Sequence, residues 1–147
     1  MDKVKIDNFT LANPNMHFPY WREISISESI KIKKTIISKL NLPSIITDLD
    51  LIKYIDMKGI SKGLLDLDDY ESIRRTLIHN LPPTDNPLVY INWYRMDKID
   101  QMYLKEVITN FDDIWYPSAD DIDIIDISIS WIFSISHFGE IKLIELP

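Results

Sequence analysis

The sequence predicts an α+β fold in a single domain spanning residues 1–147, with N-terminal helices packed on a C-terminal antiparallel β-sheet. Two patterns lead to this prediction. Apolar residues recur at helical spacing within the first 81 residues, and they alternate with a two-residue period near the C-terminus. The 147 residues are 46% hydrophobic, which is enough for one core. The chain contains no internal repeat or linker-like stretch.

The N-terminal part begins with a segment rich in proline and aromatic residues and continues into a helix. Residues 11–22 are expected to be irregular and to pack on their aromatic rings. Ser25 and Glu28 have the spacing of a capping box, in which a hydroxyl and a carboxylate satisfy free amides at a helix start. Isoleucines at helical spacing follow, and Pro43 ends this helix at residue 40 or 41.

Two further helices are expected before residue 82. Thr47 is placed to open a short helix, and Gly59 stops it. Aspartates within residues 66–69 favour the start of the next helix, because the helix macrodipole attracts negative charge there. Its apolar stripe continues until Pro82 closes it.

After residue 87 the pattern changes. Residues 88–94 are mostly β-branched and aromatic, which is typical of a central strand covered on both faces. A fourth helix is expected to start at Asp97 or Asp100, because apolar side chains recur at helical spacing between residues 99 and 108.

The strongest two-residue period lies at residues 125–135, where every odd position is apolar and every even position but one is Asp or Ser. This alternation predicts a strand with one buried and one polar face. Two adjacent isoleucines at 124–125 break the phase and indicate a bulge or a turn near Asp126. Gly139 is expected to allow a tight reversal into a returning strand at residues 141–146.

The composition excludes several kinds of site. There are no cysteines, which excludes disulfides, thiolate metal sites and cysteine nucleophiles. Three scattered glycines cannot form a Walker loop or a dinucleotide-binding loop, both of which need clustered glycines. The three histidines lie too far apart in the sequence to give a zinc-ligand pair at helical or hairpin spacing. We therefore expect no cofactor and no metal.

Charge is distributed unevenly along the chain. The formal net charge is −7, and residues 82–147 contribute four basic and twelve acidic side chains. A negative field repels phosphate backbones, so we do not expect nucleic-acid binding. The same field attracts basic protein surfaces or divalent cations, although a charge of this size is also ordinary for a small soluble domain.

Features that direct a chain to a membrane are missing from the sequence. No stretch approaches the ~20 apolar residues that a membrane-spanning helix needs. The first residues lack the basic start and apolar core of a signal peptide. A cytoplasmic protein without membrane contact is therefore expected.

The main candidate site is an acidic segment at residues 112–126, which contains six aspartates and no Lys or Arg. The aspartates surround two aromatic residues, and Trp115 is expected to be the most exposed tryptophan of the chain. Aromatic anchors beside charged side chains are typical of surfaces that bind a protein partner. The residues expected to bind a basic partner are Asp112, Asp113, Trp115, Tyr116, Asp120, Asp121 and Asp123.

Other interpretations of this segment stay open. In a structural interpretation, the aspartates cap helices and bind loop amides. In a metal-binding interpretation they would hold Ca²⁺ or Mg²⁺, but the central glycine and terminal glutamate of an EF-hand loop are absent. A metal-dependent or acid/base hydrolase would combine the Asp112–Asp126 cluster with His137. A regulatory domain would self-associate through residues 141–146, taken as an edge strand.

The C-terminal third also resembles a known group of proteins. Residues 115–121 read Trp-Tyr-Pro-Ser-Ala-Asp-Asp, and Asp126, Trp131, His137 and Gly139 follow. This pattern is similar to that of small bacterial immunity proteins of polymorphic toxins, including contact-dependent growth-inhibition systems. The resemblance implies a non-enzymatic inhibitor that binds a cognate toxin domain in the cytoplasm. It brings no established binding residues with it.

The residues and the resemblance favour the same function. Nuclease toxins are basic because their substrate is polyanionic, so an acidic inhibitor is steered towards them and covers their phosphate-binding face. We therefore expect an immunity-type protein that neutralises a basic, nuclease-like toxin domain by stoichiometric occlusion.

Overall fold

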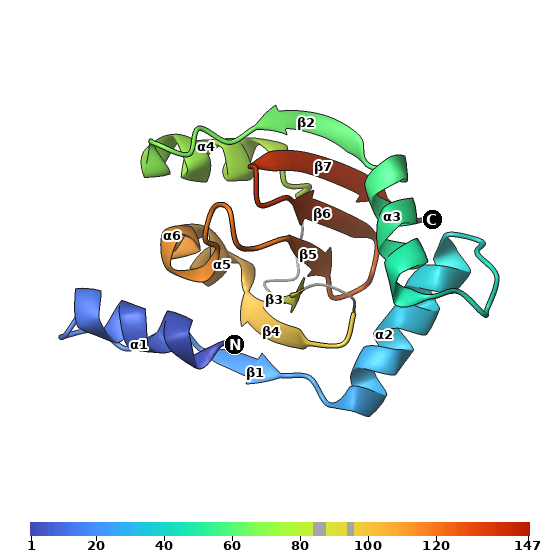
Figure 1. Cartoon of the computed structure of the whole chain (residues 1–147), viewed down its shortest axis with the longest axis horizontal. Helices are drawn as coiled ribbons and strands as arrows, with labels where there is room; N and C mark the ends of the chain where they lie inside the picture. The colour runs from blue at the N-terminus through green and yellow to red at the C-terminus, as the bar shows by residue number, and fades with distance from the viewer. Residues whose placement is uncertain (84–87, 94–95) are drawn as a thin grey trace.

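The computed structural model describes residues 1–83, 88–93 and 96–147 of the chain. These residues form one seven-stranded sheet with helices on both faces (Figure 1). The predicted α+β fold is confirmed. None of the helices in these residues is long and apolar enough to cross a membrane.

Helices and strands alternate along the chain. The helices are α1 (Lys3–Ala12), α2 (Ile26–Lys39), α3 (Asp48–Lys58), α4 (Tyr70–Asn80), α5 (Leu104–Thr109) and α6 (Phe111–Ile114). The strands are β1 (Trp21–Glu23), β2 (Ile60–Leu64), β3 (Leu88–Asn92), β4 (Ile99–Tyr103), β5 (Ile122–Asp126), β6 (Trp131–Ile135) and β7 (Glu140–Glu145).

The sheet has the strand order β1-β4-β3-β5-β6-β7-β2, and neighbouring strands are antiparallel. The strand expected at residues 88–94 is present as β3, near the middle of the sheet, while Tyr94 lies outside the described residues. The returning strand expected at residues 141–146 is present as β7. The expectation that it forms an edge is wrong, because β7 pairs with β6 on one side and β2 on the other. The edge on that side is β2, whose five residues are all exposed, and β1 forms the opposite edge.

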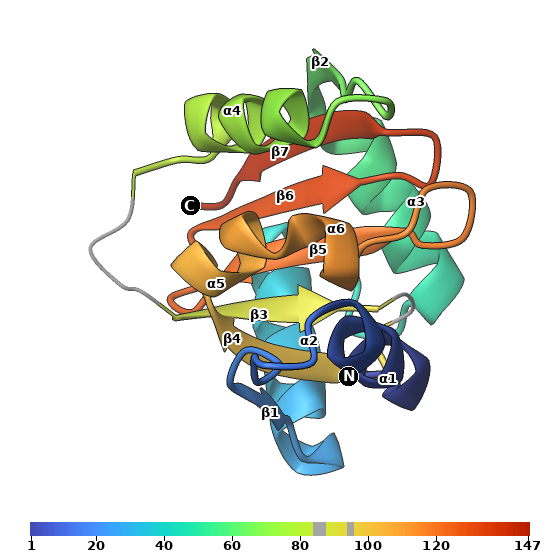
Figure 2. The ribbon, with the colours of Figure 1, turned by 90° about the vertical axis from the view of Figure 1, so that its left-hand side faces the viewer.

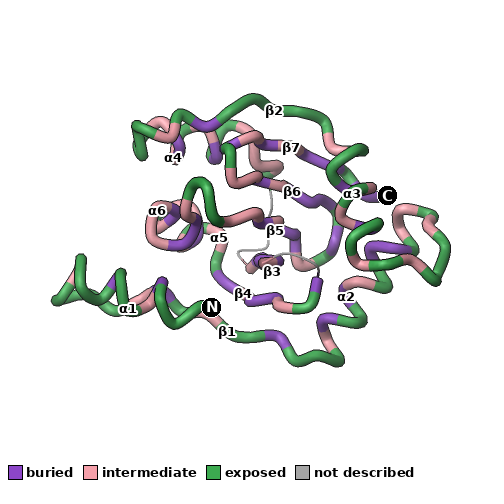
Figure 3. Tube along the Cα trace, in the orientation of Figure 1, coloured by how far each residue is buried: buried purple, intermediate pink, exposed green. Residues whose placement is uncertain are grey.

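Each face of the sheet has its own core. Figure 2 shows α1, α4, α5 and α6 in front of one face, with α2 and α3 behind the other. Successive side chains of a strand point to opposite faces. On β6, Trp131 and Phe133 therefore join the core under the first group of helices, and Ile132 joins the core under α2 and α3. The buried residues concentrate along the central strands (Figure 3).

The three helices expected in the first half are present as α2, α3 and α4. Ser25 and Glu28 form both hydrogen bonds of the expected capping box. Thr47 and Asp69 cap α3 and α4 by accepting hydrogen bonds from the backbone amides three residues later. Gly59 directly follows the last residue of α3, as expected.

The helix expected to start at Asp97 or Asp100 is wrong in its first half. Residues 99–103 form β4, which pairs with β1 and with β3, and α5 begins only at Leu104. Over so short a run, the apolar positions fit a strand as well as a helix. Pairing with a strand on each side decides between them, because local propensity is weak beside such tertiary contacts.

The single strand expected at residues 125–135 is a hairpin. β5 ends at Asp126, residues 127–130 form the connection, and β6 begins at Trp131. The turn expected near Asp126 is therefore confirmed. The buried Asp126 carboxylate accepts hydrogen bonds from the Ser128 amide at 3.1 Å and from the Ser130 hydroxyl at 2.8 Å.

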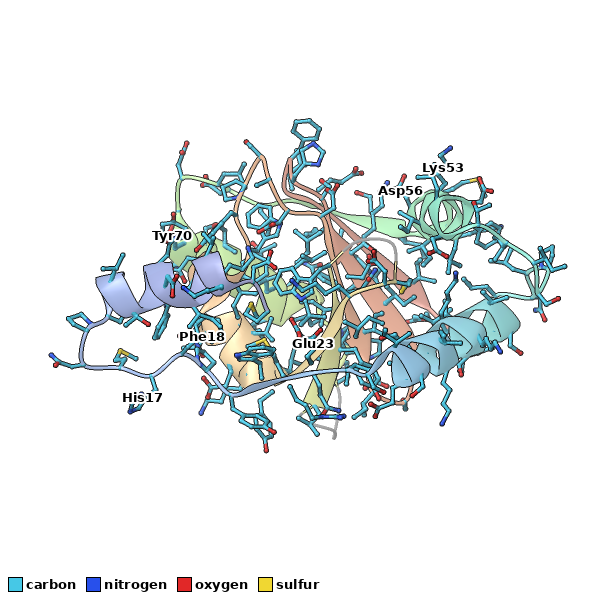
Figure 4. All side chains as sticks on the ribbon, turned by 60° about the horizontal axis from the view of Figure 1, so that its bottom comes forward. His17, Phe18, Glu23, Lys53, Asp56 and Tyr70 are labelled. Atoms are coloured by element: carbon cyan, nitrogen blue, oxygen red, sulfur yellow. The ribbon has the colours of Figure 1, made fainter. Side chains whose placement is uncertain are left out.

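The sequence pattern does not predict α1, which carries a weak apolar stripe. It buries Lys5 and Phe9. The ring of Phe9 meets that of Phe18 edge-on, with 5.3 Å between centroids. In Figure 4, Phe18 lies beside α1 and His17 points away from it. The irregular segment is shorter than the expected residues 11–22, because residues 11–12 belong to α1 and residues 21–22 to β1, but it packs on aromatic rings as expected.

Candidate functional site

The residues predicted to bind a partner do not form one continuous surface. Asp112 and Asp113 lie on α6, where the Asp112 carboxylate is 3.6 Å from the Arg74 guanidinium of α4. Arg74 also donates a hydrogen bond to the Thr109 carbonyl at 2.6 Å. Burial raises the pKa of Asp113, and the negative charge of Asp112 raises it further. The ion pair between Asp112 and Arg74 therefore joins α6 to α4 on one face of the sheet.

Trp115 is buried, so the expectation that it exposes an edge and anchors a partner is wrong. Its side chain is 2% exposed. The ring stacks on Phe111, with 5.4 Å between centroids, and its Nε1 donates to the backbone carbonyl of Asp120 at 2.8 Å. Trp115 therefore holds the acidic segment onto the core.

Asp120 faces inward onto a lysine. Its carboxylate pairs with Lys5 of α1, which is 3% exposed, and accepts a hydrogen bond from the Tyr116 amide at 2.8 Å. The Lys5 ammonium lies 4.0 Å from the centre of the Tyr116 ring and 5.2 Å from that of Trp93. Cation–π contacts and an ion pair thus fix Asp120 and Tyr116 against α1.

Asp121 connects the acidic segment to the turn between β6 and β7. Its Oδ1 accepts hydrogen bonds from the His137 amide at 2.7 Å and lies 2.8 Å from the His137 Nδ1. The Ser118 amide donates to the His137 carbonyl at 2.8 Å. These contacts give His137 a positioning function for the loop, in agreement with the structural interpretation of the motif.

Asp123 belongs to a row of polar side chains that crosses four strands. The register places Asn92, Asp123, Ser134 and Lys142 opposite one another on β3, β5, β6 and β7. Asn92 Nδ2 donates to Asp123 Oδ2 at 2.8 Å, and Ser134 Oγ donates to Asp123 Oδ1 at 2.5 Å. Directly paired residues share one face of a sheet. This row lies on the face covered by α3.

A pocket of about 170 Å³ lies between this polar row and α3, and we call it the α3 pocket. Asp56 of α3 accepts a hydrogen bond from the Lys142 ammonium at 2.6 Å, and Glu140 lies 3.5 Å from the same nitrogen. Figure 4 shows Asp56 on α3, with Lys53 one turn earlier on the same helix. The apolar side chains that α3 contributes to the lining are those of Ile52 and Ile55, whereas the side chains of Ile122 and Ile135 belong to the core on the other face of the sheet.

The electrostatics of the α3 pocket are dominated by carboxylates. Burial raises the pKa of Asp123; the hydrogen bonds from Ser134 and Asn92 oppose this shift, and the charges of Asp121 and Asp56 add to it. The hydrogen bond to Asp56 raises the pKa of Lys142. Among the described residues that line the pocket, Lys142 carries the one ammonium group, and it is held charged beside several acidic groups.

A second hollow adjoins the α3 pocket. Its volume is about 320 Å³, and it is lined by Trp93, Ala119, Asp120 and Asp121. Asp121 lines both hollows. The structure therefore brings Asp120, Asp121 and Asp123 together at one end of the sheet, and it leaves Asp112 and Asp113 on α6.

Sequence reasoning missed part of this site. Asp56, Asn92 and Lys142 lie far apart in the sequence, and only the sheet register and the packing of α3 bring them together. The sequence does show Asn92 within an apolar strand and Lys142 between two apolar residues, and both could have indicated the site. A polar side chain at such a position indicates either a hydrogen-bonded partner or a pocket.

Comparisons with family models, with curated proteins and with solved structures find no match to this chain. Within the described ranges, no group of three or more His, Asp or Glu side chains is arranged to hold a metal ion.

Proposed function

We propose that this protein is an immunity-type inhibitor that binds a basic toxin domain and blocks it by stoichiometric occlusion. The observation that carries the proposal is the α3 pocket with its adjoining hollow, where Asp121 lines both and acidic side chains outnumber cationic ones. A concave, negatively charged surface with apolar walls fits a protruding basic side chain of a protein partner.

The overall charge supports the same proposal. A net charge of −7 steers a basic partner towards the protein at long range. The resemblance of the C-terminal motif to immunity proteins points to the same class of partner. The binding surface proposed now differs from the one expected from the sequence, since Trp115 is buried and Asp56, Glu140 and Lys142 are added.

The proposal predicts that a large gene beside the gene of this protein ends in a small basic domain, and the test uses that domain. Co-expression with that domain is expected to restore growth, and the purified proteins are expected to form a one-to-one complex. The association rate is expected to fall with increasing ionic strength, because steering between opposite charges is screened by salt. If there is neither a complex nor restored growth, the proposal is wrong.

One observation favours a hydrolase as the second candidate. The Asp121 carboxylate orients the His137 ring through Nδ1, as a carboxylate orients the base of a catalytic triad. A hydrolase of this kind would lose activity in His137→Gln while an inhibitor would keep its affinity for the toxin. The candidate requires turnover of an ester or peptide substrate by the purified chain, which a panel of chromogenic esters and peptides measures.

A further inference from the structure

The α3 pocket has the size and lining of a site for one elongated side chain. Its volume is about 170 Å³, which is the volume that about six water molecules occupy in liquid water. Ile52 and Ile55 of α3 form an apolar wall on one side, and the polar row of the sheet lies on the other. Such a lining suits a ligand with an aliphatic stem and a polar head.

The charge of the lining is unbalanced. Carboxylates of four described residues line the pocket, and one ammonium group faces them. Lys142 donates to Asp56 at 2.6 Å and lies 3.5 Å from Glu140. The pocket therefore carries an excess of negative charge that a cation would neutralise. The four carboxylates are those of Asp56, Asp121, Asp123 and Glu140.

Asp123 lies on the pocket floor in a fixed orientation. Its two oxygens each accept one hydrogen bond, from Asn92 at 2.8 Å and from Ser134 at 2.5 Å. A carboxylate has about four acceptor positions, so each oxygen can take a further donor. Because Asn92 and Ser134 lie on neighbouring strands, the acceptor is preorganised before a ligand arrives.

We propose that the α3 pocket receives an arginine side chain of the protein partner, whose guanidinium group donates to Asp123 and whose stem packs on Ile52 and Ile55 of α3. This assignment rests on the proposed function and deepens it. A guanidinium group matches the geometry of a carboxylate and is more weakly hydrated than an ammonium group, so it enters a partly apolar pocket more readily. Arginine is also among the residues that most often dominate binding at interfaces.

The first experiment tests the pocket without a toxin. The full chain, labelled with ¹⁵N, is titrated with N-butylguanidinium and with the neutral isostere N-butylurea, and amide chemical shifts are followed. Butylguanidinium is expected to shift the Asn92 side-chain amide and the backbone amides of Ser134 and Lys142 in a saturable manner. Equal binding of butylurea, or shifts outside the pocket alone, would overturn the proposal.

Three variants test how charge affects butylguanidinium binding. One is expected to weaken binding, one to strengthen it and one to leave it unchanged. Asp123→Asn is expected to weaken butylguanidinium binding about tenfold, the value of one charge-assisted hydrogen bond. Lys142→Gln removes the competing cation and is expected to tighten binding, which a misfolded variant cannot do. Asp68→Asn carries the same charge change at an exposed turn before α4 and is expected to leave binding unchanged. Weaker binding in Lys142→Gln contradicts the proposal.

The second experiment separates the pocket from the proposed function. The same variants are measured against the basic toxin domain, with butylguanidinium as competitor. Weaker toxin binding in Asp123→Asn, together with competition, supports the arginine assignment. If the toxin binds Asp123→Asn as tightly as the wild type, the arginine assignment is wrong while the proposed function stands. If the wild type does not bind the toxin at all, the proposed function fails, and with it the partner as the source of the side chain.

Discussion

Individual aspartates of the acidic segment have different environments, although the sequence presents them alike. Asp123 lines the α3 pocket, and burial raises its pKa. For Asp126, burial alone would raise the pKa, but hydrogen bonds from Ser128 and Ser130 lower it below its usual value. The sequence places both residues in the acidic segment, residues 112–126, and only Asp123 among the residues expected to bind a partner. It could not separate their environments, because their hydrogen-bond donors depend on strand register and turn geometry.

The opposite pKa shifts predict opposite effects on stability. A raised pKa means that the native state binds a proton more tightly than the unfolded state, so Asp123 makes stability fall as pH rises from near 3.8 through its native pKa. Asp123→Asn is expected to remove this decrease. Urea unfolding between pH 3 and pH 8 measures it.

Asp126→Asn is the matched control for this experiment. Because the pKa of Asp126 is lowered, its contribution to stability is present above the unfolded-state pKa and lost as pH falls through the native pKa. The variant is therefore expected to flatten the acid side of the profile, in the opposite sense to Asp123→Asn. Identical changes in both profiles would contradict the assigned environments.

Gly139 and Gly63 allow backbone strain to be compared with steric crowding. Both have positive φ, +83° and +112°. A Cβ at Gly139 would lie 2.9 Å from Leu67 Cδ2 and 3.4 Å from Leu65 Cβ, whereas a Cβ at Gly63 meets nothing within 4 Å. Alanine at either position is expected to cost about 1–2 kcal/mol through strain, with more at Gly139. Urea unfolding of the two variants measures the difference, and a smaller loss in Gly139→Ala would contradict it.

At the scale of elements, helix ends were easier to predict than strands. The starts of α2 and α3 follow from capping residues within a few positions, and the structure has those contacts. The predictions for β4 and for the β5–β6 hairpin were wrong. A short apolar run fits both the helical and the two-residue period, and only the strands that pair with it decide which structure forms. The position of β2 at an edge of the sheet also depends on the strand order, which is set by contacts between residues far apart in the sequence.

The α2 capping box gives a prediction for a single element. The Ser25 hydroxyl accepts a hydrogen bond from the Glu28 amide, and the Glu28 carboxylate accepts one from the Ser25 amide. Ser25→Ala is expected to destabilise the protein by about 1 kcal/mol. Ser38→Ala, at an exposed position of the same helix, is expected to be neutral or slightly stabilising, because alanine favours helices. Equal effects of the two substitutions in thermal unfolding would remove the cap as the cause.

At the scale of the whole molecule, the sequence predicted the fold class and the sign of the charge but not the location of the site. Hydrophobic periodicity is a local property of each segment. The fold class can therefore be predicted correctly even when a single element is assigned wrongly. The α3 pocket combines α3 with β3, β5, β6 and β7. Its assembly depends on a sheet order that no local pattern specifies.

The response to divalent cations distinguishes an inhibitor from a metal-dependent hydrolase. The Lys142 ammonium lies among the pocket carboxylates, where it repels a divalent cation and occupies acceptor positions that such an ion needs. We therefore expect Ca²⁺, Mg²⁺ and Mn²⁺ at millimolar concentration to leave the melting temperature unchanged. A site occupied at 100 times its Kd would add about 2.7 kcal/mol, which for a chain of this size raises the melting temperature by several degrees. Such a rise would favour the hydrolase. If Lys142→Gln alone acquired a metal-dependent rise, the ammonium group would be identified as the element that excludes the metal from the wild-type pocket.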